Sequence, residues 1–378
     1  MSLPLSGVRV LDLTRLLPGA FTTLMLAELG ADVIKVEDPG RGDPMRGLPP
    51  QVGGRGIYDL LLNRGKKSVA LDLRRPASAP ALARLVAQAD VVIESFRPQT
   101  ARAFGVTAEQ LRAGRPALIH CALTGYGQTG PYAERPGHDL NYVAVSGLLS
   151  ADRPHAQELP RMFIADVGAG AMSAVIAILA ALVARGRTGE GASLDLSMHD
   201  AALYWVMLPA ARDLVTGAAE AIGELPTFGD HACYGVYETK GGGRIALGAM
   251  EHKFWETFCA AVGRPDLVAR HRSDADDQRA LIDTLRGIFL ERTRDEWLVF
   301  FEGRDVCLSP VNTPAEALRD AHIAARGTVV TGPHGRAIRP PFAAAPPALT
   351  PAPAVGADTD AVLSEAGFSA AEIAAFRL

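Results

Sequence analysis

The sequence predicts an α/β protein with a Rossmann-like large domain, built on a parallel sheet, and a smaller α+β domain. In the first third of the chain, β-rich runs alternate with helical segments, which is typical of βαβ units and their parallel strands. Beyond residue 229 the pattern changes to two antiparallel strands around a glycine turn, with helices after them. The length of 378 residues also exceeds that of a usual single core, so two domains are expected.

The elements of the large domain follow from β-rich runs and glycine punctuation. The run VRVLDL at 8–13 predicts the first strand, residues 21–29 fit a helix, and Gly30 suits its C-terminal cap. The turn TRLLPGAF between them lacks the GxGxxG pattern, so NAD is not indicated. Further strands are expected at 31–36, 68–71, 91–94, 117–121 and 192–196, and further helices at 57–62, 80–87, 108–113, 140–149, 167–184 and 201–208.

Four segments describe the predicted domain organisation. Residues 1–190 form the N-terminal part of the large, ligand-binding α/β domain, 191–228 a strand, helix and linker, 229–326 the small α+β domain, and 327–378 a C-terminal return to the large domain. In the small domain, strands are expected at 233–239 and 244–249 and helices at 252–262, 277–293 and 294–302, and two short helices at 359–378 end the chain. The apolar run 169–183 is short and rich in Ala and Gly, so a buried helix is expected and no membrane partner.

Composition excludes several functional classes. Apolar residues make up 48% and charged residues 21%, and the net charge of −4 gives no basic footprint for a nucleic acid. The four cysteines lie far apart without CxxC spacing, so neither a disulfide framework nor a metal site is indicated. The polar start of the chain does not resemble a signal peptide, and a cytoplasmic location is expected.

Basic residues gather in the loops between the βα units. Any one of them would normally be a solvated surface charge. Together, in loops beyond the strand ends of an open α/β sheet, they predict a phosphate-binding cluster. The residues are Arg41, Arg46, Arg64, Lys66, Lys67, Arg97 and Arg102.

Three proton-handling side chains stand next to turn or helix signals. His138 follows a Pro-Gly turn and precedes Asp139, which is expected to cap the helix 140–149, and Asp166 precedes an Ala/Gly-rich helix. Glu251 follows the second strand of the small domain. Each has an ordinary alternative role: a surface histidine, an N-cap, and a first-turn acid that complements the helix dipole. The glycine-rich turn GYGQTGP at 125–131 allows close backbone approach to a ligand, although turns between strands use the same residues.

The segments GYGQTGPY, GHDLNY, the Asp166 helix start and GAMEHKFW together resemble the α-methylacyl-CoA racemases of the class III CoA-transferase family. The resemblance implies an interlocked homodimer whose active site lies between the large domain of one subunit and the small domain of the other. It implies His138 and Asp166 as catalytic residues and Glu251, from the partner, as the hydrogen-bond partner of the histidine. It implies an acyl-CoA thioester as substrate, with no other cofactor required. The expected CoA-binding residues are Arg41, Lys66, Lys67, Arg97, Arg102, Gly125, Tyr126, Gly127, Asp139 and Tyr142.

The resemblance leaves three functions open. The first is racemisation of 2-methylacyl-CoA, in which His138 and Asp166 exchange the α-proton on opposite faces and backbone amides at the start of the Asp166 helix stabilise the enolate. The second is CoA transfer with Asp166 as nucleophile, which has no need of His138 and Glu251. The third is a non-catalytic CoA-ester binding protein. One departure concerns the loop after the second strand, which carries Glu37 and Asp38 where some racemases have a basic residue, leaving Arg41 or Arg46 as substitutes for the diphosphate contact.

Overall fold

The structure is a computed structural model that describes residues 3–152, 162–218, 230–342 and 350–377. The chain divides into two compact units. The large unit contains Met1–Leu208 and Ala325–Leu378, and the small unit contains Pro209–Ala324. The C-terminal residues therefore belong to the same unit as the N-terminal ones, and each unit is described by itself.

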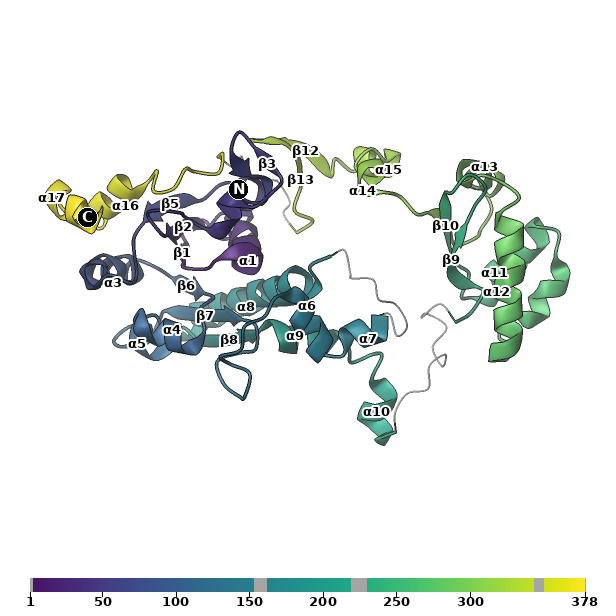
Figure 1. The fold of residues 1–378 in the computed structure, drawn as a ribbon, viewed down its shortest axis with the longest axis horizontal. Helices are drawn as coiled ribbons and strands as arrows, with labels where there is room; N and C mark the ends of the chain where they lie inside the picture. Colours follow the sequence, from purple (N-terminus) through teal and green to yellow (C-terminus); the bar gives the residue numbers. More distant parts are fainter. Residues whose placement is uncertain (1–2, 153–161, 219–229, 343–349, 378) are drawn as a thin grey trace. The chain divides into compact units, whose positions relative to one another are not determined.

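A six-stranded parallel sheet forms the centre of the large unit (Figure 1). This confirms the predicted α/β class. The strand order is β5-β2-β1-β6-β7-β8, so the sheet grows from β1 in both directions. The strands are β1 (Arg9–Asp12), β2 (Asp32–Glu37), β5 (Lys67–Ala70), β6 (Val91–Glu94), β7 (Ile119–Thr124) and β8 (Ser193–Ser197). Strand β7 begins later than the predicted residue 117, because Arg115 to Leu118 close a turn through a backbone hydrogen bond of 3.1 Å.

Helices cover both faces of this sheet. On one face, α1 (Leu16–Glu28) and α8 (Met172–Thr188) pack their apolar side chains against Val10, Ile93 and Leu123. On the other face, a second core joins β1, β2 and β5 to five helices. These are α3 (Ala79–Ala87), α4 (Pro98–Ala103), α5 (Ala108–Arg112), α16 (Thr359–Glu365) and α17 (Ala370–Arg377). Helix α4 was not expected, and α1 begins earlier than the predicted residue 21 because its first turn accommodates Pro18.

Shorter elements complete the large unit. The predicted helix 140–149 is divided at Ser146 and Gly147, where Gly147 has a φ of 81°. Its two parts are α6 (Asp139–Val145) and α7 (Leu148–Asp152). The other short elements are η1 (Pro44–Gly47), β3 (Gln51–Val52), β4 (Arg55–Gly56), α2 (Ile57–Leu62), η2 (Pro76–Ser78), η3 (Ile164–Ala171), α9 (Met198–Trp205), β12 (Val329–Gly332) and β13 (Gly335–Ile338).

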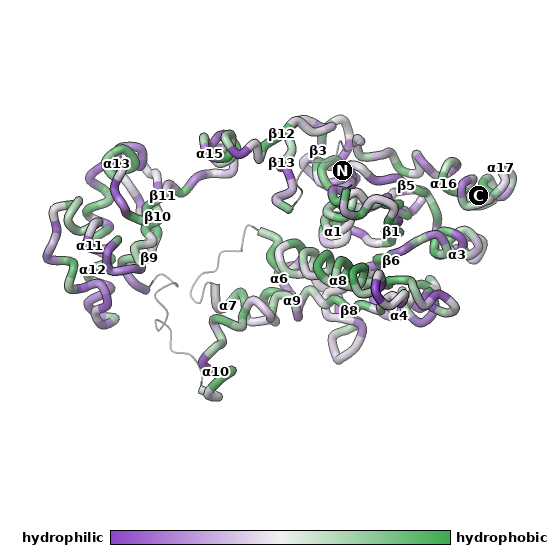
Figure 2. The backbone as a smooth tube through the Cα atoms, turned by 180° about the vertical axis from the view of Figure 1, so that it is seen from behind, coloured by the Kyte–Doolittle hydropathy of each residue, from purple (hydrophilic) through white to green (hydrophobic). Residues whose placement is uncertain are grey.

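The helical stretch Ile164–Thr188, which joins η3 to α8, is long and apolar enough to cross a membrane by length and composition alone. In Figure 2 it is among the most hydrophobic parts of the large unit. It packs against α1, α9 and β7. These contacts account for the apolar character of its inner side only. Ile176 and Val183 on the same helix are exposed, so the expected burial of this helix is partial.

The small unit is an antiparallel sheet covered by helices, which confirms the predicted α+β class. Strands β9 (Tyr234–Glu238) and β10 (Arg244–Gly248) form the expected hairpin, and β11 (Leu308–Pro310) adds an unexpected third strand. Stacked and edge-on aromatic rings, including Trp255, Phe289 and Trp297, fill its core. Its helices are α10 (Ala211–Thr216), α11 (His252–Ala261), η5 (Pro265–Arg270), α12 (Ala275–Phe289), α13 (Arg294–Phe300) and α14 (Pro314–Ala317), and α15 (Ala321–Ala325) lies at the boundary between the units.

Candidate active site

His138 occupies the N-cap position of α6, with extended backbone dihedrals. Its backbone N–H donates to Asn141 Oδ1 (3.0 Å), which satisfies one of the free amides at this helix end. The side chain of His138 is exposed. The expectation that Asp139 caps the helix was wrong, because the helix starts at Asp139 itself and the carboxylate of this residue is used elsewhere.

Asp166 lies in the first turn of η3, a π-helical segment that runs directly into α8. It is therefore not the N-cap that the sequence indicated; Phe163 has that position. Gly168 and Gly170 allow η3 to pack closely on α9, since a Cβ on Gly170 would lie 2.6 Å from the Met198 side chain and 2.7 Å from the Ala165 carbonyl. Short π-helical segments inside α-helices occur frequently at functional sites.

A hydrogen bond joins the two segments that carry His138 and Asp166. The backbone N–H of Asp166 donates to Asp139 Oδ1 at 2.8 Å. The candidate base and the candidate acid are thereby held on neighbouring, directly bonded turns. This bond was not foreseen from the sequence, because Asp139 and Asp166 are separated by 27 positions.

The carboxyl group of Asp166 is electrostatically unusual. Burial, and secondly the negative charge of Asp139, raise the pKa of Asp166 to about 7. A carboxyl group with this pKa exchanges a proton near neutral pH, which is the property required of a general acid or base. Burial of Tyr142, and secondly the negative charge of Asp166, raise the pKa of the Tyr142 phenol above its ordinary range. Tyr142 is therefore a neutral hydrogen-bond donor here.

Aromatic rings hold the glycine-rich turn against α6. Tyr126 packs edge-on against Tyr142, with ring centroids 5.1 Å apart. The Tyr142 hydroxyl donates to the Gly137 carbonyl (2.6 Å), just before His138. A Cβ on Gly125 would lie 2.5 Å from the Tyr142 ring, and Gly127 has a φ of 81°. Glycine is thus required at both positions, in one case for close packing and in the other for backbone conformation.

The amides expected to stabilise an enolate are already bonded. The Asp166 amide donates to Asp139, and the amides of Val167 and Gly168 both donate to the Phe163 carbonyl at 3.2 Å. A hydrogen-bonded amide is not a free donor for a developing oxyanion. The expectation of an oxyanion site at the start of this helix therefore has no support in the structure.

Glu251 belongs to the small unit. It is the N-cap of α11, in the short connection from β10, and its side chain is exposed. Its backbone carbonyl oxygen accepts hydrogen bonds from the amides of Phe254 and Trp255, and its carboxylate makes no hydrogen bond in the cap. Its role toward His138 stays a prediction.

The predicted phosphate-binding cations fall into two groups. Arg41, Arg97 and Arg102 are exposed, and Arg97 directly precedes α4 beyond the carboxyl end of β6. Lys66 is fully buried, and its ammonium group donates to Ala20 O (3.0 Å), Thr23 Oγ1 (2.7 Å) and Asn63 Oδ1 (2.9 Å). A phosphate cannot reach it, so the prediction is not retained for Lys66.

Other members of the predicted cluster are also engaged in the protein. Lys67 starts β5 and pairs with Asp32 (2.8 Å) at the start of β2, so it lies at the amino edge of the sheet, opposite the carboxyl ends. Arg46 forms ion pairs with Glu37 (2.6 Å) and Asp59 (3.4 Å), and Arg64 pairs with Glu28. Arg46 therefore does not substitute for a diphosphate contact, whereas Arg41 retains that possibility.

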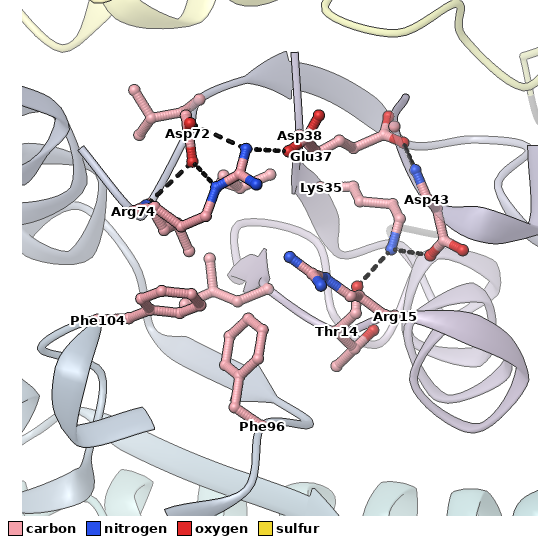
Figure 3. A pocket seen from close by; sticks show the side chains of 15 residues that line it. Thr14, Arg15, Lys35, Glu37, Asp38, Asp43, Asp72, Arg74, Phe96 and Phe104 are labelled. Atoms are coloured by element: carbon pink, nitrogen blue, oxygen red, sulfur yellow. Dashed lines mark hydrogen bonds and ion pairs between the residues drawn. The ribbon is translucent and has the colours of Figure 1, made fainter. Parts of the chain in front are cut away.

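A crevice opens at the carboxyl ends of β1, β2, β5 and β6 (Figure 3). Because the sheet grows in both directions from β1, this is the topological switch point, where ligands of open α/β folds bind. Its lining includes Arg15, Arg74 and the edge-on pair Phe96 and Phe104, with ring centroids 5.1 Å apart. None of these residues was in the predicted site. The position of Arg15 in the turn after the first strand was the signal that could have identified it.

Among the residues that the structure describes, no group of three or more His, Cys, Asp or Glu side chains is placed to hold a metal ion. Cys121, Cys233 and Cys259 are buried thiols, and Cys307 is an exposed one. Burial raises the pKa of the Cys121 thiol, which keeps it protonated and unreactive.

Comparison with known proteins shows the same architecture over nearly the whole chain. The family model for CoA-transferase family III matches residues 5–359. Human succinyl-CoA:glutarate CoA-transferase is 34% identical over 88% of this chain and 77% of its own length. Human alpha-methylacyl-CoA racemase is 31% identical over 98% of this chain and 95% of its own length. The crystal structure of a CAIB/BAIF family protein from Brucella suis superposes with a TM-score of 0.84 and 30% identity, covering 97% of this chain and all of that chain. The chain belongs to CoA-transferase family III.

Proposed function

We propose that this protein is a racemase that interconverts (R)- and (S)-2-methylacyl-CoA thioesters. The observation that carries the proposal is the carboxyl group of Asp166, whose pKa of about 7 matches proton exchange at neutral pH. It lies on a turn bonded through Asp139 to the helix start at His138. A 1,1-proton transfer needs two proton-handling groups that reach opposite faces of one carbon, and the bond between the two turns supports the proposal by holding His138 and Asp166 on neighbouring segments.

In this mechanism one residue removes the α-proton and the other supplies one to the opposite face. When the imidazole of His138 accepts the proton, the electron pair of the C–H bond moves into the C–C bond and onto the thioester oxygen, giving an enolate. The protonated carboxyl group of Asp166 then donates its proton to the α-carbon and becomes a carboxylate. The reverse direction begins from that carboxylate, which is why a pKa near neutrality favours both directions.

The competing function is CoA transfer. One specific observation favours it: Asp166 is a partly buried carboxylate in a family that includes succinyl-CoA:glutarate CoA-transferase. In that mechanism ionised Asp166 attacks the thioester carbonyl, the C–S bond breaks, and an acyl anhydride forms with release of the CoA thiolate. At a pKa of about 7, about half of the Asp166 carboxyl group is ionised at neutral pH, so this pKa is compatible with both mechanisms and the experiments below separate them.

The proposal includes a homodimer with a shared active site, in which Glu251 of one subunit orients His138 of the other. The support is the amount of apolar side chain that α8 and α9 leave uncovered. Ile176 is 68% exposed, Val183 62% and Tyr204 71%. Large apolar side chains left exposed in numbers on neighbouring helices are typical of a protein interface. An association through these helices would cover it.

The deciding experiment is incubation of (S)-2-methylacyl-CoA in D2O without an added carboxylic acid. Racemisation should introduce deuterium at the α-carbon and give both epimers, read by mass spectrometry and chiral chromatography. Asp166→Asn, which keeps the size of the side chain, should stop the formation of the second epimer. CoA movement that requires an acceptor acid, with no α-deuterium, would refute the racemase and establish the transferase.

Hydroxylamine gives an independent distinction. It should leave the racemase unmodified, because no covalent bond to Asp166 forms. A transferase incubated with acyl-CoA would be trapped as the Asp166 hydroxamate and inactivated.

A further inference from the structure

The glycine-rich turn that leads from β7 toward α6 is bonded to two neighbouring elements of the large unit. The carboxylate of Asp195 on β8 accepts the Gln128 amide with both of its oxygens, each at 3.1 Å. The Gly125 carbonyl accepts the amide of His199, in the first turn of α9, at 3.0 Å. The Gln128 amide is thus used within the protein, and the position of the turn is fixed by the fold itself.

Tyr126 lies in this turn and contacts aromatic rings from three different segments. Its ring is edge-on to Tyr142 of α6, with centroids 5.1 Å apart, and edge-on to Tyr132 further along the same connection, at 5.5 Å. It is tilted against the imidazole of His199 at 5.9 Å. Edge-on ring pairs at these distances are favourable beyond the apolar area that they bury. The ring of Tyr126 therefore joins the turn to both α6 and α9.

The contact with Tyr142 fixes the backbone directly before His138. The buried Tyr142 ring carries a hydroxyl that donates to the Gly137 carbonyl at 2.6 Å. A Cβ on Gly125 or Gly137 would lie 2.5 or 2.6 Å from the same ring, so two glycines are needed for the backbone to approach it. Because Tyr126 packs against this ring, it holds in place the residue to which the backbone before His138 is bonded.

The contact with His199 leads to the segment of Asp166. His199 belongs to α9, and α9 packs on η3, which carries Asp166 in its first turn. Helices α6 and α9 lie side by side (Figure 1), and each of them also contacts η3. Tyr126 thus touches both the helix that begins after His138 and the helix that supports Asp166.

We propose that Tyr126 is a positioning residue for proton transfer, which fixes the segment of His138 relative to that of Asp166 and acts on the chemical step rather than on CoA affinity. This inference rests on the proposed racemase function. Removal and return of the α-proton require two groups held at opposite faces of one carbon. A displacement of about 1 Å, caused by a substitution away from the reacting atoms, can cost about 10²-fold in rate.

The test compares Tyr126→Leu, which removes the ring contacts, with Tyr126→Phe, which keeps the ring. Tyr126→Leu should lower kcat for α-deuterium exchange of a 2-methylacyl-CoA by about 10- to 100-fold, while KM and the calorimetric Kd for CoA change by less than about threefold. Tyr126→Phe should recover most of the lost turnover. Tyr132→Leu is the matched control: it removes a ring contact of Tyr126 that faces neither α6 nor α9, so its loss of kcat should be much smaller.

A second variant and a second measurement make the test independent of the folding of Tyr126→Leu. Asp195→Ala releases the turn from β8 at an exposed position, and it should also lower kcat without weakening CoA binding. The imidazole resonances of His138 in histidine-labelled protein, assigned with His138→Ala, should shift in Tyr126→Leu and in Asp195→Ala, and much less in Tyr126→Phe.

The outcomes separate this inference from the proposed function. Lost CoA affinity with unchanged kcat in Tyr126→Leu would overturn the positioning role, and so would an equal loss of kcat in Tyr132→Leu. Unchanged kcat and unchanged His138 resonances in Asp195→Ala would do the same. A lower melting temperature without a selective fall of kcat would show that Tyr126 only stabilises the core. Absence of α-deuterium with the unaltered protein would instead refute the racemase, and the His138 resonances would still test the position.

Discussion

Replacing Asp139 by Asn should lower the pKa of Asp166 while preserving the local structure. The pKa of the Asp166 carboxyl group is raised from 3.8 to about 7, by burial first and by the charge of Asp139 second. A shift of about 3 units corresponds to roughly 4 kcal/mol. Because Asp139 is the smaller of the two causes, its share is below half of that. We therefore expect a fall of about 1 unit, since removing a neighbouring negative charge favours the ionised form.

Asp139→Asn changes the size of the side chain very little and keeps the oxygen that bonds to Asp166. The oxygen that accepts the Asp166 amide at 2.8 Å is retained in Asn, so the bond between the two turns survives. With a pKa of about 6, the protonated fraction of Asp166 at pH 7 falls from about a half to about a tenth. The rate of proton donation to the enolate should fall with it.

Two measurements check this prediction. Carboxyl 13C resonances of an aspartate-labelled protein, with the Asp166 signal assigned by Asp166→Asn, give the pKa directly. The pH profile of α-deuterium exchange should move by the same amount. Glu190→Gln, an exposed charge after α8, is the control and should shift neither curve. An unchanged or higher pKa for Asp166 in Asp139→Asn would show that the coupling inferred from the structure is absent.

Two further predictions concern the dimer and the sheet. If Glu251 acts across a subunit interface, inactive His138→Ala subunits and weakened Glu251→Ala subunits should recover turnover when they are refolded together. The reason is that each mixed dimer holds one site in which both residues are intact. If turnover does not recover, the shared site is removed from the proposal. Glu94 is fully buried at the end of β6. Burial, and to a smaller extent the negative charge of Asp195, raise the pKa of its carboxyl group to about 8, although a hydrogen bond from the Phe96 amide acts in the opposite direction. Between pH 4.5 and pH 8 the folded state binds more protons at Glu94 than the unfolded state does. The free energy of unfolding should therefore decrease as pH rises, by at most about 5 kcal/mol. Glu94→Gln should remove this part of the pH dependence in urea titrations, and an unchanged slope would show that Glu94 is ionised in the fold.

The local sequence was sufficient for the α/β and α+β classes and for most of the longer strands and helices, but not for short elements such as α4 and β11. Strand and helix periods, and turn residues such as Gly30, act within a few positions and leave a direct trace in the chain. His138 and Asp166 were indicated by the resemblance of their motifs to those of the racemases, since a residue beside a turn or a helix start also has an ordinary structural role. His138 stands directly before its helix, as expected, but Asp139 and Asp166 do not have the N-cap positions predicted for them. The π-helical start of η3 and the use of Asp139 as a bridge depend on packing against α6 and α9.

The sequence determined which charged and proton-handling residues the protein carries, and only the tertiary structure decided what each of them does. Lys66 and Arg97 look alike as loop cations, but the fold buries Lys66 among carbonyl and hydroxyl oxygens and leaves Arg97 exposed beyond β6. Arg15 attracted no notice in the sequence. Among the described residues it has no ion-pair partner in the crevice, because Asp38 and Asp72 pair with Arg74 and Asp43 pairs with Lys35. The availability of a charge depends on partners distant in the chain, and burial and charge pairing are properties of the folded protein.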